Sequence, residues 1–148
     1  MVLRFSVSKS KDIGTRAESA VVKALHRLGF PNAERRALAG VLDKGDILVN
    51  PGSNMPVIVE VKGGDAAKYA SDGQILRWMD ETDTEVDNAE AHFGFLVVQR
   101  PGIGYPNAHR WWAVTSLGAL DPDADDGQSP VRMTLEDMTR WVDGWLLG

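Results

Sequence analysis

The segment FGFLVVQ at residues 93–99 constrains the fold of this chain more than any other feature of the sequence. It is almost free of polar side chains, whereas a strand with one face in water alternates apolar and polar residues. We therefore expect a β-strand that is buried on both faces, and a sheet covered on both faces is typical of α/β proteins.

Periodicity and turn residues predict the other elements. Apolar residues recur at helical spacing between Ile13 and Leu28, and Gly29 followed by Pro31 forms a stop signal. The turn sequence Asn-Pro-Gly-Ser-Asn at 50–54 separates two short segments that are rich in β-branched residues. In all we expect helices over about 13–28, 71–80 (resuming after Thr82) and 135–146, and strands over 33–38, 46–49, 57–62, 93–99 and 110–115.

The order of these elements predicts an α/β fold with a mixed sheet, because a meander at one end is followed by a crossover at the other. A chain of 148 residues, 43% of them hydrophobic, suits a single domain over 1–148. The acidic segment 121–130 is expected to be a loop before the last helix, where Trp141 and Trp145 flank the apolar face. These two side chains favour a core or dimer contact over base stacking.

Composition excludes several classes of protein. The absence of Cys excludes disulfide scaffolds, thiolate zinc sites and cysteine nucleophiles. No run approaches the roughly 18 apolar residues of a membrane span and the start lacks a signal-peptide pattern, so we expect a cytoplasmic protein without a membrane partner. No phosphate-binding or dinucleotide-binding glycine motif occurs, so no nucleotide cofactor is expected.

Charge is divided unevenly along the chain. Residues 1–44 carry nine Lys and Arg against four acidic residues, whereas residues 45–148 carry seven against seventeen. Positive potential that could attract nucleic acid is therefore concentrated near the N-terminus, although ordinary surface charge would give the same asymmetry. The acid-rich stretch from Asp80 to Glu90 is expected to be an exposed helix face.

The two strands around the 50–54 turn bring charged residues together. If Asn50 faces Pro56, then Leu48 faces Ile58 and Asp46 faces Glu60. Directly opposed side chains have Cβ atoms roughly 4.5–5.5 Å apart, so two carboxylates placed in this way repel each other.

Magnesium is a natural compensator for that repulsion, because it prefers oxygen ligands and binds through one or two carboxylates. Lys62 lies on the same face of the strand, about 7 Å beyond Glu60. It could orient or deprotonate a water molecule, or stabilise charge on a phosphate undergoing attack. The alternative is an ordinary ion pair between Glu60 and Lys62, with Asp46 as a turn residue.

These residues resemble the PD-(D/E)XK nuclease superfamily. Gly45-Asp46 followed by Val59-Glu60-Val61-Lys62, behind a helix that bears Glu18, matches its motif, with Gly45 in place of the Pro. The resemblance covers about 13–99 and implies an α-β-β-β-α-β core, to which a strand, a loop and a helix over about 108–148 are appended. It implies that Asp46 and Glu60 bind Mg²⁺ or Mn²⁺ and that Lys62 is catalytic.

Within the superfamily, the chain most resembles archaeal-type Holliday junction resolvases and related small phage endonucleases. That resemblance implies that Glu18 completes the metal site and that Gln74 points into it. Each residue has a competing explanation, because Thr15-Arg16-Ala17-Glu18 and Ser71-Asp72-Gly73-Gln74 also match the helix capping box.

Together these features predict a metal-dependent DNA endonuclease of recombination or repair that acts on branched or duplex DNA. The expected phosphate contacts are Lys11, Arg16, Arg35 and Arg36. Resolution of a junction takes two matched cuts, so we expect a homodimer with the flank of Trp141 and Trp145 at its interface. An end-processing or sequence-specific nuclease, and a non-catalytic DNA-binding or structural protein, remain open as alternatives.

Overall fold

The computed structural model describes residues 2–36 and 45–148, with side chains from residue 11 onward within these ranges. Its helices are α1 (Val2–Arg27), α2 (Asp65–Lys68), α3 (Asp72–Ala89), the 3₁₀ helix η1 (Tyr105–Arg110), α4 (Leu117–Leu120) and α5 (Leu135–Leu147). Its strands are β1 (Glu34–Arg35), β2 (Ile47–Leu48), β3 (Val57–Lys62), β4 (Phe93–Val98), β5 (Trp112–Ser116) and β6 (Pro130–Thr134).

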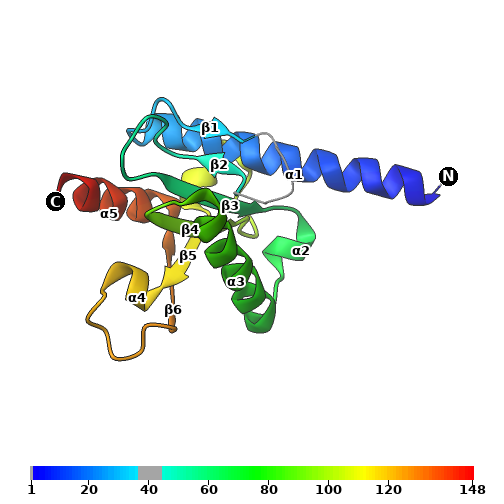
Figure 1. Cartoon of the computed structure of the whole chain (residues 1–148). Coiled ribbons are helices and arrows are strands. Elements are labelled where there is room, and N and C mark those ends of the chain that lie inside the picture. Colours follow the sequence, from blue (N-terminus) through cyan, green and yellow to red (C-terminus); the bar gives the residue numbers. More distant parts are fainter. Residues whose placement is uncertain (1, 37–44) are drawn as a thin grey trace.

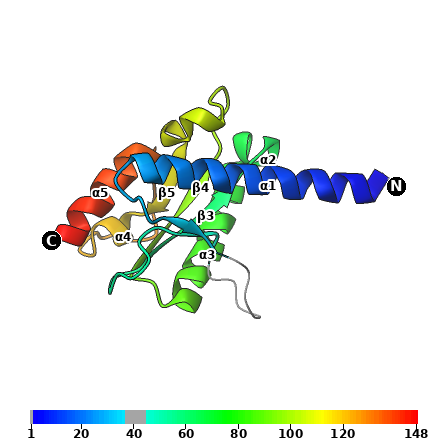
Figure 2. The same cartoon turned by 90° about the horizontal axis from the view of Figure 1, so that it is seen from above.

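The strands of the described residues form one sheet in the order β1-β2-β3-β4-β5-β6. Strands β3 and β4 are parallel and the other neighbouring pairs are antiparallel, so the sheet is mixed. Helix α1 crosses one face and α3 the other, as the two views in Figures 1 and 2 show. The α/β class predicted from the sequence is therefore confirmed.

Burial explains why the sheet takes this layered form. In β4, Phe95, Leu96 and Val97 are each no more than 1% exposed, which confirms the expected strand buried on both faces. Odd-numbered residues of β3 join the cluster formed with α1 and α5, whereas Leu96 and Val98 of β4 pack with Met79 of α3. Each face of the sheet thus has its own apolar layer.

Helix α1 begins at Val2, eleven residues before the expected start. No Pro interrupts residues 2–12, and each added helical residue gains a backbone hydrogen bond, so the helix continues past Gly14. Thr15 and Glu18 therefore lie inside the helix, and the explanation of Thr15 as an N-cap is wrong.

Helix α3 runs unbroken from Asp72 to Ala89 instead of pausing near Thr82. The Thr82 hydroxyl donates to the carbonyl of Trp78 at 2.8 Å, which satisfies this buried polar group within the helix. The expected strand over 33–38 is observed as β1, and residues 37 and 38 lie outside the described part of the chain.

The sequence interpretation missed strand β6 and misplaced the start of β5. Pro130 opens β6, which is compatible with an edge strand because no hydrogen bond from its nitrogen is needed there. Residues 105–110 form η1, so β5 begins at Trp112 and not at Arg110.

Trp141 and Trp145 pack on the core, as the sequence favoured. Their rings lie 4.9 and 5.8 Å from the ring of Phe93, and both side chains are partly buried. Both side chains are half-buried by this packing and not fully exposed, and their place at a dimer interface stays a prediction. Within the described residues, no helix combines the length and apolar character needed to cross a bilayer.

Candidate active site

The pairing of β2 with β3 brings the side chains of Asp46 and Glu60 next to each other. Leu48 pairs with Ile58, as expected, and Ile47 pairs with Val59. The Asp46 backbone amide donates to the carbonyl of Val59 at 3.0 Å, so at Asp46 the hydrogen bonding departs by one residue from this register. The register predicted from the turn is therefore confirmed for Leu48 and Ile58, and the carboxyl groups of Asp46 and Glu60 are neighbours although the two residues are not register partners.

Local contacts hold this register in place. The Asn50 side chain accepts from the amide of Val57 at 2.8 Å and donates to the carbonyl of Met55 at 3.0 Å, so one amide group closes the turn. Gly45 has a φ of +91°, and a Cβ there would lie 3.0 Å from Ile58 Cδ1. Glycine tolerates this positive φ and has no Cβ to press against Ile58, so it suits the position directly before Asp46.

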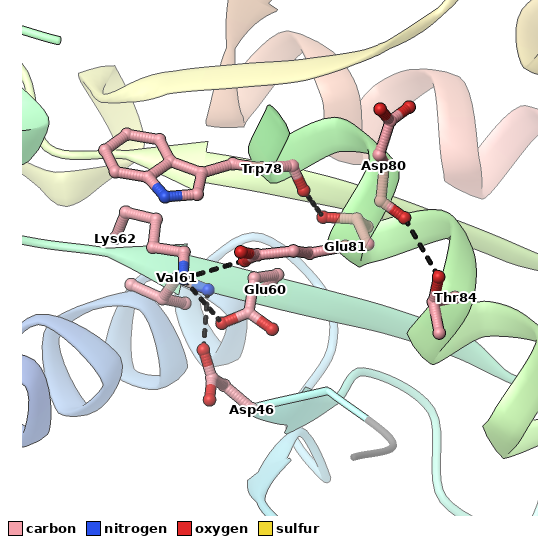
Figure 3. Close-up of polar contacts among 9 residues, drawn as sticks. Asp46, Glu60, Val61, Lys62, Trp78, Asp80, Glu81 and Thr84 are labelled. Atoms are coloured by element: carbon pink, nitrogen blue, oxygen red, sulfur yellow. Dashed lines mark hydrogen bonds and ion pairs between the residues drawn. The ribbon is translucent and has the colours of Figure 1, made fainter. Parts of the chain in front are cut away.

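Asp46 is oriented by the backbone of the neighbouring strand. Its Oδ2 accepts a hydrogen bond of 2.8 Å from the Val61 amide, as Figure 3 shows. The pKa of Asp46 is raised to about 7, chiefly by burial and then by the neighbouring Glu60 carboxyl. The hydrogen bond from the Val61 amide acts in the opposite direction and lowers it.

Glu60 lies between two other acids. Its side chain is within hydrogen-bonding reach of Asp46 on one side and of Glu85 on the other. Burial raises the pKa of Glu60 to about 8; the hydrogen bond with Asp46 lowers it, and the carboxyl of Glu85 raises it. Glu60 is 5% exposed, and its Oε2 has no hydrogen-bond partner among the described residues. Two carboxyl groups in contact need a shared proton or a cation, because neither carboxylate can donate a hydrogen bond.

Glu18 reaches the same cluster from α1. Its pKa is raised, chiefly by burial and then by the charge of Asp46, while Arg35 lowers it. Both Nε and Nη2 of Arg35 donate to Glu18 Oε2, at 3.0 and 2.8 Å. The structure therefore brings Glu18, Asp46, Glu60 and Glu85 together as a row of neighbouring carboxyl groups, which we call the acidic cluster.

Lys62 supplies positive charge beside this cluster. Its Nζ lies 3.9 Å from Glu60 Oε1 and 3.3 Å from Glu81 Oε2, and 5.5 Å from the centre of the Trp78 ring (Figure 3). Burial lowers the pKa of Lys62, but the carboxylates of Glu60 and Glu81 more than offset this, so the net shift is upward. The ammonium group is therefore charged at neutral pH.

Two acidic residues of this site were missed by the sequence interpretation. Glu81 pairs with Lys62, and Glu85 is 4% exposed beside Glu60, so the expectation that residues 80–90 form an exposed face is wrong for Glu85. Trp78, Glu81 and Glu85 recur at spacings of three and four residues, which places them on one face of a helix. That signal is visible only if the helix continues through Thr82.

Gln74 lies at the start of α3 and serves its N-terminus. The Ser71 hydroxyl accepts from the Gln74 amide at 3.1 Å, which confirms the expected cap. The Gln74 side chain accepts from Arg77 Nη2 at 3.0 Å, and the described contacts do not join it to the acidic cluster.

The basic residues expected to contact phosphate have different surroundings. Arg35 is paired with Glu18, whereas the guanidinium of Arg16 lies over the ring of Tyr105, 4.6 Å from its centre. The Arg36 amide donates to the carbonyl of Asp46 at 2.8 Å, and Lys11 is exposed on α1. Arg35 and Arg36 thus adjoin the acidic cluster, while Arg16 packs against η1.

The oxygen donors of the acidic cluster are of the kind that Mg²⁺ and Mn²⁺ prefer. Within the described ranges, no three His, Cys, Asp or Glu side chains are already arranged around a point that could hold a metal ion. Magnesium needs only one or two protein carboxylates, and the buried Glu60 oxygen lacks a hydrogen bond, so Asp46 and Glu60 fit such an ion.

Comparison with models of known protein families, with curated proteins and with solved structures finds no match to this chain.

Proposed function

We propose that this protein is a Mg²⁺- or Mn²⁺-dependent DNA endonuclease of the PD-(D/E)XK type, acting on branched DNA as a Holliday junction resolvase does. The observation that carries the proposal is the contact between the buried carboxyl groups of Asp46 and Glu60, with Lys62 ion-paired to Glu60 two residues along the same strand. An ordinary strand-end ion pair would explain Lys62 and Glu60, but it would not explain a further carboxyl group buried beside them.

In this proposal Asp46 and Glu60 hold the metal ion, and Glu18 completes the site from α1. The ion would activate a water molecule for attack on phosphorus and offset negative charge on the phosphate oxygens. The Val61 amide fixes the Asp46 carboxylate, and Arg35 fixes that of Glu18, so these two neighbours position the ligands.

Lys62 stabilises the negative charge that develops on the phosphate during attack. Its position beside Glu60 directs the ammonium group toward the proposed metal ligands, and its raised pKa keeps it protonated. A protonated lysine can donate hydrogen bonds but cannot accept a proton from water. The role of charge stabilisation is therefore favoured over that of general base.

The proposal is tested by a cleavage panel with four-way junction, flap, single-stranded and linear duplex DNA in Mg²⁺ and in EDTA. We expect cleavage of branched DNA by the wild-type chain in Mg²⁺, and loss of at least a hundredfold in Asp46→Asn, Glu60→Gln and Lys62→Ala. Asp143→Asn and Lys23→Ala, which change the same residue types at exposed positions away from the acidic cluster, serve as matched controls.

Other outcomes of this panel identify the alternatives. Cleavage confined to ends indicates an exonuclease, and cleavage at one duplex sequence indicates a sequence-specific endonuclease. DNA binding with no cleavage of any substrate indicates a non-catalytic DNA-binding protein. Full activity in EDTA, or in Asp46→Asn, contradicts the proposal.

Two matched cuts at a junction also lead us to propose a homodimer. Light scattering with and without junction DNA measures the mass of the complex. A monomer in both conditions would favour the end-processing alternative.

A further inference from the structure

A cavity of about 450 Å³ opens beside the proposed active site, between the α2–α3 region and strands β4 to β6. Val98 forms part of its wall, and Val98 is the register partner of Lys62 in the parallel pair of strands. Trp112, the partner of Val98 on β5, also lines it. Neighbouring strands are about 4.8 Å apart, so Val98 lies about 5 Å and Trp112 about 10 Å from β3.

The walls of the cavity combine apolar surface with positive charge. Ile75, Leu76 and Val98 contribute apolar side chains, and Lys68 and Arg132 contribute cations. Asp72 also lines the cavity, and Nζ of Lys68 lies 3.6 Å from Oδ1 of the exposed Asp65. These acids offset part of the positive charge of Lys68 and Arg132. The size falls within the range of small-ligand sites, which are mostly apolar with a few charged groups.

Two arginine side chains are held against Trp112. The guanidinium carbon of Arg100, which follows β4, lies 3.9 Å from the centre of the ring, and that of Arg132 on β6 lies 4.2 Å from it. Stacking of this kind orients a planar guanidinium while its N–H groups stay available for a phosphate. Arg132 has no ion pair among the described residues.

Two exposed apolar side chains lie at this cavity or next to it in the sequence. Among the described residues, the large hydrophobic side chains that are exposed are Tyr69, Leu76 and Leu147, at 75%, 45% and 88%. Leu76 lines the cavity, and Tyr69 lies between two residues that line it. Exposed apolar surface beside a cavity is typical of a binding site.

We propose that this cavity binds one unpaired nucleotide of the DNA substrate, with the base against Ile75 and Leu76 and its phosphate on Arg132 and Lys68. A single base fits an apolar cavity of this size, whereas a paired base is covered by its partner and by the stack. A span of about 10 Å corresponds to roughly three nucleotides at 3.4 Å per nucleotide, so one strand can reach both sites. This inference rests on the proposed function and narrows its substrate to DNA with unpaired nucleotides.

Binding of fluorescently labelled oligothymidylate, followed by polarisation in EDTA, tests the site without any cleavage. We expect Arg132→Ala and Leu76→Glu to weaken binding at least tenfold, because the first removes a charged phosphate contact and the second places a carboxylate against the base. Arg140→Ala on α5 removes the same charge from an exposed helix face and should leave the affinity unchanged. Unlabelled thymidine 5′-monophosphate should compete, and inorganic phosphate at the same concentration should compete less.

The test separates this inference from the proposed function. Asp46→Asn should bind the oligonucleotide as the wild-type chain does, even if it cleaves nothing. If the wild-type chain cleaves branched DNA but Arg132→Ala and Leu76→Glu bind and cleave normally, the cavity is not a nucleotide site and the nuclease proposal stands. Equal competition by phosphate alone, or preference of the cavity for a peptide over the oligonucleotide, also overturns the inference.

Discussion

At the scale of single residues, Glu60 shows how charge and burial oppose each other in this protein. A carboxyl group that is 5% exposed and adjoins two further carboxyl groups cannot ionise without cost. Its nearest compensating cation is Lys62, at 3.9 Å, which Glu81 also engages. The protein without a metal ion therefore retains protons on this cluster at neutral pH.

Proton retention predicts how stability depends on pH. The pKa values of Asp46 and Glu60 are raised from 3.8 and 4.5 to about 7 and 8, so between about pH 4 and pH 8 the folded state binds more protons than the unfolded state. The free energy of unfolding in EDTA should therefore fall by several kcal/mol as pH rises through this window. Urea denaturation at several pH values measures this; Asp46→Asn should flatten the dependence, whereas Asp143→Asn should not.

Replacing Glu85 tests its contact with Glu60. An amide can donate a hydrogen bond to a carboxylate at any pH, so Glu85→Gln should raise the free energy of unfolding by about 1 kcal/mol above pH 8. Glu85→Ala leaves a void at a buried position and should lower it. Equal destabilisation by both substitutions would show that the contact with Glu60 carries no repulsion.

The residue-level prediction from sequence succeeded where strand pairing decides the geometry. Asp46 and Glu60 belong to one hairpin, and the 50–54 turn determines which residues face each other. Glu85 could not be found in this way, because its neighbour Glu60 lies in a different layer and only packing of α3 on the sheet joins them. The role of Arg35 as partner of Glu18 depends in the same way on α1 packing beside β1.

At the scale of elements, α1 approaches the end of β3 through a glycine. A Cβ at Gly63 would lie 2.5 Å from the Cβ of Ala17, which is directly before Glu18 in the helix. The small size of both residues therefore determines how closely α1 can bring Glu18 to the strand that carries Lys62.

Enlarging this contact should destabilise the protein. We expect Gly63→Ala to lower the free energy of unfolding by about 1–3 kcal/mol through overpacking. Gly14 lies in α1, and a Cβ added there would meet open space. Gly14→Ala should therefore raise the free energy of unfolding by about 0.5–1 kcal/mol. In thermal or urea melts, adding Ala17→Gly to Gly63→Ala should recover part of the loss, and strict additivity of the two substitutions would contradict the contact.

Element boundaries show what periodicity can and cannot decide. Strands β3 and β4 were predictable because apolar, β-branched runs allow few alternatives. The start of α1 was not, since the positions that would continue the apolar face back from Ile13 are Ser6, Lys9 and Ser10. Strand β6 depends on pairing with β5, and its exposed and half-buried residues gave no such signal.

At the scale of the whole molecule, the acidic cluster draws on both layers of the fold. Helices α1 and α3 lie on opposite faces of the sheet (Figure 1); Glu18 of α1 adjoins Asp46, and Glu85 of α3 adjoins Glu60. The α/β class could be predicted from the order of elements. Which side chains of the two helical layers approach each other could be seen only in the folded structure.

A cation bound at such a meeting point should stabilise the entire domain. We expect Mg²⁺ or Mn²⁺ to raise the melting temperature at pH 8 as its concentration increases, because a ligand of the folded state stabilises it by mass action, by about 2.7 kcal/mol at a hundred times Kd. Glu60→Gln should abolish the increase and Asp143→Asn should retain it. Identical increases in all three proteins would place the cation elsewhere.

The indole of Trp78, which faces the ammonium group of Lys62 at 5.5 Å, has a consequence for observing this chemistry. The emission of an indole responds to the electric field of a nearby charge, and here the charge belongs to the residue paired with both Glu60 and Glu81. Any event that moves or neutralises Lys62 thus alters the light emitted by a chromophore of the chain itself, and the cluster can be followed spectroscopically without a label.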